Sequence, residues 1–66
     1  MNALLIGKKL RDLRGERSQK EVCEATGIRQ TALSNYEKGK RIPRDETKEK
    51  LAKYYHVSTT HLFFDH

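Results

Sequence analysis

The 66-residue sequence contains one cysteine, one proline and no tryptophan. A single cysteine cannot form an internal disulfide, which agrees with a reducing compartment. The sequence also lacks any run of about 18 apolar residues, and charged residues soon follow its short apolar start, so neither a membrane span nor a signal peptide is expected. We therefore expect a cytoplasmic protein that does not enter a membrane.

Acidic residues are the scarcer charge: nine Asp and Glu stand against 14 Lys and Arg, which leaves a net charge of +5. This excess favours a polyanionic partner. Apolar residues make up only 35% of the chain, but they recur at helical spacing, which indicates a compact helical domain rather than disorder. A chain this short buries about 60% of its unfolded surface, so its core is marginal and self-association would help it.

The stretch from Ser18 to Glu37 contains two short amphipathic segments around one glycine. Ser18 and Glu21 have the S-x-x-E spacing of a capping box, which predicts a helix start at about Ser18. Gly27 ends that helix, because glycine adopts a positive φ without a Cβ penalty. This layout is typical of a helix-turn-helix, which lays its second helix in the major groove of DNA.

The second of these helices, at about 29–37, has one apolar and one polar face. Ile28 and Leu33 are spaced as a hydrophobic staple around an N-cap at Arg29. An arginine there cannot accept hydrogen bonds from the free N–H groups of the helix start, and its charge opposes the helix dipole. A residue that departs in this way from the capping preference often has a functional role. The polar face is rich in side chains that offer groove contacts, where ordinary surface helices carry Glu and Lys. From this helix we expect DNA contacts by Arg29, Gln30, Thr31, Ser34 and Asn35.

A basic segment follows, and Gly39 and Pro43 predict that it is a loop, with Ile42 as its inward-facing side chain. Taken alone, the loop is either solvated or a phosphate clamp, and its place beside the polar face favours the clamp. Gln19, the first residue of the preceding helix, is either a phosphate contact or a plain first-turn residue. The loop's expected phosphate contacts are Lys38, Lys40, Arg41 and Arg44.

Three further helices are predicted, one before the motif and two after it. One covers about Leu4 to Arg14, although Gly7 weakens its first turn by about 1 kcal/mol and leaves a start at Ile6 or Gly7 open. Another begins near Asp45 and ends at about Tyr55. A short last helix is capped by Ser58 and reaches about Phe64. The fold class is therefore all-α, a compact five-helix bundle forming one domain over 1–66.

Neither a metal site nor a catalytic site is expected. The three histidines lie five residues apart, so they do not share a helical face as an H-x-x-x-H pair does. A core this small leaves no room for a substrate cleft, so we expect no enzyme activity, cofactor or small-molecule substrate. The side chains weighed as metal ligands are Cys23, His56, His61, Asp65 and His66.

The chain resembles a known family in the residues Gln19, Cys23, Gly27-Ile28, Leu33-Ser34 and Glu37-x-Gly39. These are similar to the Xre-type helix-turn-helix family of phage Cro proteins and repressors, over about residues 6–64. The resemblance implies a lambda-repressor-like bundle of five helices that binds double-stranded operator DNA, usually as a homodimer on palindromic or pseudo-palindromic half-sites. Arg29 departs from the family pattern, since a capping Ser or Thr is common at that site.

The resemblance also implies roles for single residues. Gln19 would contact a phosphate, and Arg14 would pair with Glu37. The residues that would face bases are Gln30, Thr31, Ser34 and Asn35.

Two interpretations of function remain at this stage. The leading one is a sequence-specific DNA-binding transcriptional regulator, a repressor of phage or mobile-element type. The alternative is a protein-interaction module, such as an antitoxin-like or anti-repressor partner. It rests on Phe63 and Phe64, because two adjacent aromatic residues on a short helix cannot both face one core, and one of them would line a dimer interface.

Overall fold

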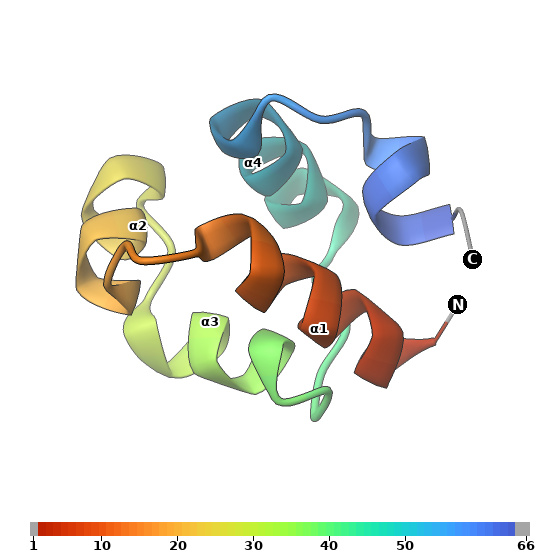
Figure 1. Cartoon of the computed structure of the whole chain (residues 1–66), viewed down its shortest axis with the longest axis horizontal. Helices are drawn as coiled ribbons and strands as arrows, with labels where there is room; N and C mark the ends of the chain where they lie inside the picture. The colour runs from red at the N-terminus through yellow and green to blue at the C-terminus, as the bar shows by residue number, and fades with distance from the viewer. Residues whose placement is uncertain (1, 65–66) are drawn as a thin grey trace.

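The computed structural model describes residues 2–64, and of Phe64 the backbone alone. Within this range there are four α-helices, one π-helical segment and no strand, so the expected all-α bundle of five helices is confirmed. The bundle measures 27 × 22 × 22 Å. In chain order its elements are α1 (Ala3–Arg14), α2 (Gln19–Thr26), α3 (Gln30–Glu37), α4 (Asp45–Tyr55) and η1 (Thr60–Phe64) (Figure 1).

Helix α1 lies at the centre of the arrangement. It packs against α3 and η1, while α2 packs against both α3 and α4 (Figure 1). One apolar core results, to which every helix contributes. Its members are Ile6, Leu10, Val22, Ile28, Leu33, Tyr36, Leu51, Ala52, Tyr55, Leu62 and Phe63.

Local capping interactions set most of the helix ends. The Ser18 hydroxyl accepts a hydrogen bond from the Glu21 N–H at 3.0 Å, as the predicted cap requires. Gly27 ends α2 with a left-handed φ of 78° and donates its N–H to the Cys23 carbonyl at 2.8 Å. Asn2 accepts the Leu5 N–H at 3.2 Å and starts α1 at Ala3. The alternative start of this helix at residue 6 or 7 was therefore wrong.

Two local expectations after α3 need correction. Ile42 is 37% exposed, whereas Pro43 is buried. Proline has no N–H to satisfy, so the loop can bury it without leaving an orphan donor. The last helix is a π-helical segment, although Ser58 caps it as expected by accepting the His61 N–H at 2.9 Å.

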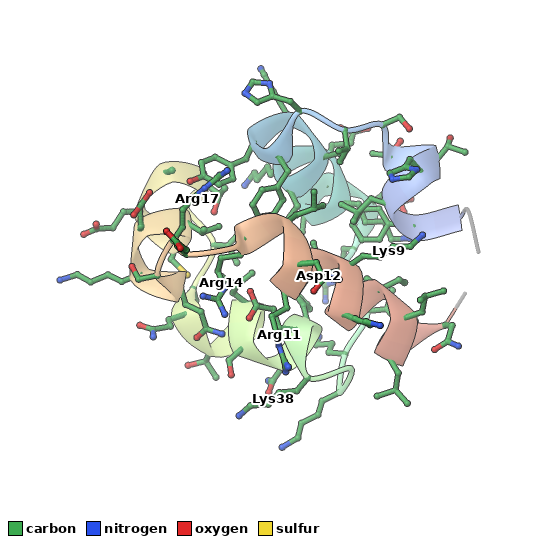
Figure 2. The ribbon with its side chains drawn as sticks, in the orientation of Figure 1. Lys9, Arg11, Asp12, Arg14, Arg17 and Lys38 are labelled. Carbon is green, nitrogen blue, oxygen red and sulfur yellow. The ribbon has the colours of Figure 1, made fainter. Side chains whose placement is uncertain are left out.

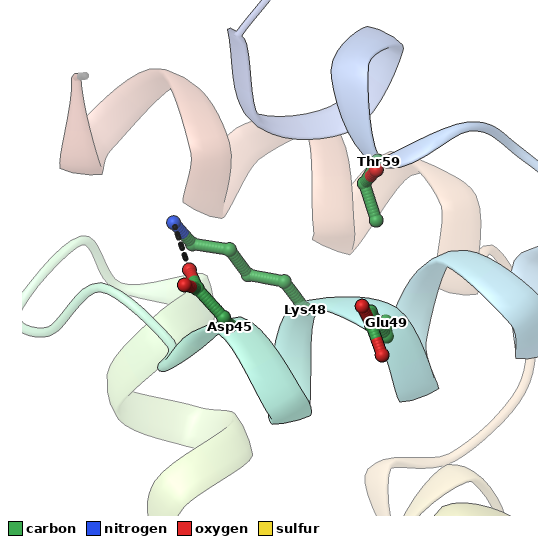
Figure 3. A pocket seen from close by; sticks show the side chains of 4 residues that line it. All are labelled: Asp45, Lys48, Glu49 and Thr59. Atoms are coloured by element: carbon green, nitrogen blue, oxygen red, sulfur yellow. Dashed lines mark hydrogen bonds and ion pairs between the residues drawn. The ribbon is translucent and has the colours of Figure 1, made fainter.

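Phe63 belongs to the core, with 1% of its surface exposed. The Lys48 ammonium lies 5.5 Å from the centre of the Phe63 ring and 3.5 Å from an Asp45 carboxylate oxygen. Figure 3 shows Lys48 and Asp45 at a hollow of about 250 Å³ that Glu49 and Thr59 also line. These contacts join η1 to α4, so Phe63 is not the interface aromatic that the protein-interaction alternative requires. The Phe64 side chain lies outside the described residues.

Arg17, in the short link between α1 and α2, contacts two tyrosines of α4. Its guanidinium lies 5.3 Å from the centre of the Tyr54 ring and 5.6 Å from that of Tyr55. The two rings meet edge to face with their centres 5.0 Å apart. No local residue pattern predicts the contact of Arg17 with these rings, because it joins positions far apart along the chain.

Gly7 allows a close approach between α1 and α3. A Cβ atom at this position would lie 2.5 Å from the Glu37 carbonyl oxygen and 2.6 Å from that of Tyr36. Both are backbone atoms at the end of α3, so they cannot move aside as a flexible side chain does. The residue that weakens α1 locally is therefore the one that lets α1 pack on α3.

We expect Gly7→Ala to destabilise the protein by about 1–3 kcal/mol, the usual cost of overpacking. In an unobstructed helix interior the same substitution stabilises by roughly 0.5–1 kcal/mol, so the sign of the change is diagnostic. Urea denaturation followed by circular dichroism measures it. Lys8→Ala, at the neighbouring exposed position, is the control and should change stability by less than about 0.5 kcal/mol. A Gly7→Ala variant as stable as wild type would contradict the close approach.

Candidate nucleic-acid interface

The exposed face of α3 and the start of α2 together form a shallow polar depression of about 390 Å³. Helix α3 buries Leu33 and Tyr36 on its opposite face, which directs its polar side chains outward. Each of the residues that line the depression was a predicted DNA contact. They are Gln19, Gln30, Thr31, Ser34, Asn35 and Lys38.

The other four predicted contacts are exposed but do not line the depression: Arg29, Lys40, Arg41 and Arg44. Arg29 occupies the N-cap of α3 and makes no side-chain capping bond, as expected from its chemistry. At the other end of α3, the Lys40 N–H donates to the Asn35 carbonyl at 2.9 Å. Basic residues thus stand at both ends of the polar face, and Arg41 and Arg44 continue along the loop to α4.

The Glu37 carboxylate joins three helices behind this face. Arg14 of α1 donates from Nε to Oε2 at 2.7 Å and from Nη2 to Oε1 at 2.9 Å. Gln19 of α2 donates from Nε2 to Oε1 at 3.0 Å. Only 2% of the Glu37 side chain is exposed, so this charge depends on its partners for solvation. The Arg14–Glu37 pair implied by the family resemblance is confirmed.

The bond to Glu37 also orients the Gln19 amide. An ionised carboxylate only accepts hydrogen bonds, so Gln19 must turn its NH₂ group toward Glu37. The second hydrogen of that NH₂ group is the one that can be donated to a DNA phosphate. Sequence reasoning missed this bond because nothing local links residues so far apart along the chain.

Burial shifts the pKa of two side chains near this junction. It raises the pKa of the Cys23 thiol, which packs against the core and is thereby made a poor nucleophile. Burial and the negative charge of Glu37 raise the pKa of Tyr55 to about 12. The Tyr55 hydroxyl has no hydrogen-bond partner among the residues that the structure describes. The hydrogen bond to Glu37 raises the pKa of Arg14 in turn.

Within residues 2–64, no three His, Cys, Asp or Glu side chains come together as metal ligands. Two of the side chains weighed for such a site, Asp65 and His66, lie outside the described residues. No helix in this range has both the length and the apolar character needed to span a bilayer.

A helix-turn-helix family model matches residues 8–62. The chain is 43% identical over 63 residues to the cryptic phage CTXphi transcriptional repressor RstR of Vibrio cholerae. The aligned region covers 92% of this chain and 57% of that protein. The chain is 41% identical over 59 residues to the HTH-type transcriptional regulator ImmR of Bacillus subtilis (strain 168), with coverage of 86% and 46%. The chain thus spans about half the length of these relatives. No solved structure matches it significantly.

We expect Glu37→Ala to destabilise the protein by about 1–3 kcal/mol, because it leaves the Arg14 charge and the Gln19 amide without the carboxylate that accepts their hydrogen bonds. Chemical denaturation measures the change. The exposed pair of Lys50 and Glu46, 3.9 Å apart, provides the control, and Lys50→Ala should cost less than about 1 kcal/mol. Equal losses in the two variants would contradict a structural role for the buried carboxylate.

Tyr55 should make stability fall at high pH. Its pKa in the folded state, about 12, exceeds its ordinary value of 10, so the folded protein holds the phenol proton more tightly than the unfolded chain. The resulting stabilisation is complete below pH 10 and is lost as the pH rises toward 12. Denaturation midpoints measured across this range should fall more steeply for wild type than for Tyr55→Phe. Parallel curves for the two proteins would show that Tyr55 is not the titrating group.

Proposed function

Because this chain belongs to the helix-turn-helix family, we propose that it is a regulator that binds specific sequences of double-stranded DNA. The polar depression over α3 is the observation that carries the proposal. Helix α3 has eight residues, and an α-helix with its side chains is about 10–12 Å in diameter, which fits a major groove about 12 Å wide. We propose that α3 lies in that groove.

The side chains of the depression divide by chemistry. Amides such as Gln30 and Asn35 can form paired hydrogen bonds with adenine, and the hydroxyls of Thr31 and Ser34 can donate or accept. These four side chains are proposed to read bases. The proposed phosphate contacts are Gln19, Arg29, Lys38, Lys40, Arg41 and Arg44, which would fix the register of the protein on the duplex.

We propose that the protein represses transcription in the cytoplasm, as a regulator of phage or mobile-element type. The names of the two relatives support this role, one being a phage transcriptional repressor and the other a transcriptional regulator. We further propose that it binds as a homodimer, since a small core gains from association. A palindrome in the DNA sequence that the protein selects would support the dimer, and an asymmetric site would argue against it. Enzymatic activity is not part of the proposal, and the protein-interaction alternative is not favoured.

The base-reading assignment is tested with a duplex selected from a random pool by the wild-type protein. We expect Gln30→Ala and Asn35→Ala each to weaken binding to this duplex by about 1–3 kcal/mol. Binding to a random duplex should change little, because it depends mainly on phosphate contacts. Titration by fluorescence anisotropy on the two duplexes measures both affinities.

Lys40→Ala and Arg41→Ala are the matched controls. They remove proposed phosphate contacts and should weaken binding to the selected and the random duplex alike. If Gln30→Ala and Asn35→Ala also reduced both affinities equally, these residues would not be reading bases.

A further inference from the structure

One row of α1 residues lies along the C-terminal end of α3. Leu4, Gly7, Arg11 and Arg14 follow the spacing of a single helical face. Leu4 lies against Gly39, where an added Cβ would be 2.9 Å from the Leu4 Cα. Gly7 lies against the last carbonyls of α3, and Arg14 binds the Glu37 carboxylate. Arg11, between Gly7 and Arg14 in this row, is therefore next to the end of α3.

Arg11 and Arg14 differ in what surrounds their charges. The Arg14 guanidinium is paired with Glu37, and 19% of its side chain is exposed. Arg11 is exposed, and no ion pair or hydrogen bond of its side chain occurs within residues 2–64. The Arg14 guanidinium is therefore paired within the protein, whereas the Arg11 guanidinium is available to a binding partner.

Lys38 brings a second cation to the same end of α3. It is exposed, follows Glu37 directly and lines the polar depression. Figure 2 shows the side chains of Arg11 and Lys38 directed toward the same edge of the molecule. A phosphate at this edge would be attracted by both cations.

We propose that Arg11 is a further DNA contact, which binds a backbone phosphate at the rim of the groove that α3 occupies. Helix α1 then contributes to the interface directly, and the phosphate-binding edge extends from Lys38 across to α1. The inference rests on the proposed function, since it needs DNA to be the ligand. The competing role is structural: a cation beside the end of α3 also stabilises the negative end of that helix dipole.

The salt dependence of binding separates these two roles. Dissociation constants for wild type, Arg11→Ala and Arg11→Lys are measured on a random-sequence duplex between about 50 and 200 mM salt. Loss of one phosphate contact should make the slope of log K against log salt shallower by about 0.9, so the wild-type advantage falls about 3.5-fold over this range. Arg11→Lys, which keeps the charge, should restore the slope.

Lys53→Ala is the control for loss of one positive charge. Lys53 is exposed on α4, beside a hollow that Ala25 and Thr26 of α2 also line, and α4 lies across α1 from α3 (Figure 1). This variant should leave the slope at its wild-type value. Thermal unfolding of Arg11→Ala shows whether its fold is intact.

Each result has a distinct meaning. A slope unchanged in Arg11→Ala, with or without a loss of thermal stability, would overturn the inference and leave the proposed function standing. A slope lowered equally by Lys53→Ala would also overturn it, because the effect would then reflect net charge alone. Absence of binding by wild type to both the random and a selected duplex would overturn the proposed function and this inference together.

Discussion

The position of α3 depends on how the buried Glu37 carboxylate is satisfied. A charge removed from water costs several kcal/mol unless hydrogen bonds replace its hydration. Here the replacements come from two other helices, Arg14 from α1 and Gln19 from α2. Both reach Glu37 only when the three helices keep one arrangement, and Gly7 lets α1 come close enough for this. The same junction therefore fixes the fold and holds the polar face in place.

Helix α3 is short, and its few residues serve two separate purposes. Its inner side chains, Leu33 and Tyr36, are part of the apolar core, and Glu37 is buried at its end. Its outer side chains make almost no contribution to that core and line the depression instead. Arg29, at the N-cap of α3, does not stabilise the start of the helix by a side-chain capping bond. It instead places a positive charge at one end of the exposed face.

Local chemistry allowed much of the fold to be predicted from the sequence. Ser18 and Gly27 act within their own turns, so the patterns that predicted the ends of α2 needed no tertiary information. The placement of Ile42 failed because burial in an irregular loop depends on the surrounding helices. The Arg17–Tyr54 contact and the Gln19–Glu37 bond join distant positions, so residue patterns did not reveal them. The Arg14–Glu37 pair was anticipated through family resemblance alone, and the base and phosphate roles of the site residues stay predictions.

The separation of the two faces of α3 has a consequence for engineering. The side chains of Gln30, Thr31, Ser34 and Asn35 line the exposed face of α3. The side chains that anchor this helix to the rest of the protein are those of Leu33, Tyr36 and Glu37. The scaffold is therefore suited to grafting, in which these four positions receive the side chains of a relative with a different target. Because Glu37 and its partners stay in place, the grafted helix would keep its angle, and recognition would be exchanged without redesign of the core.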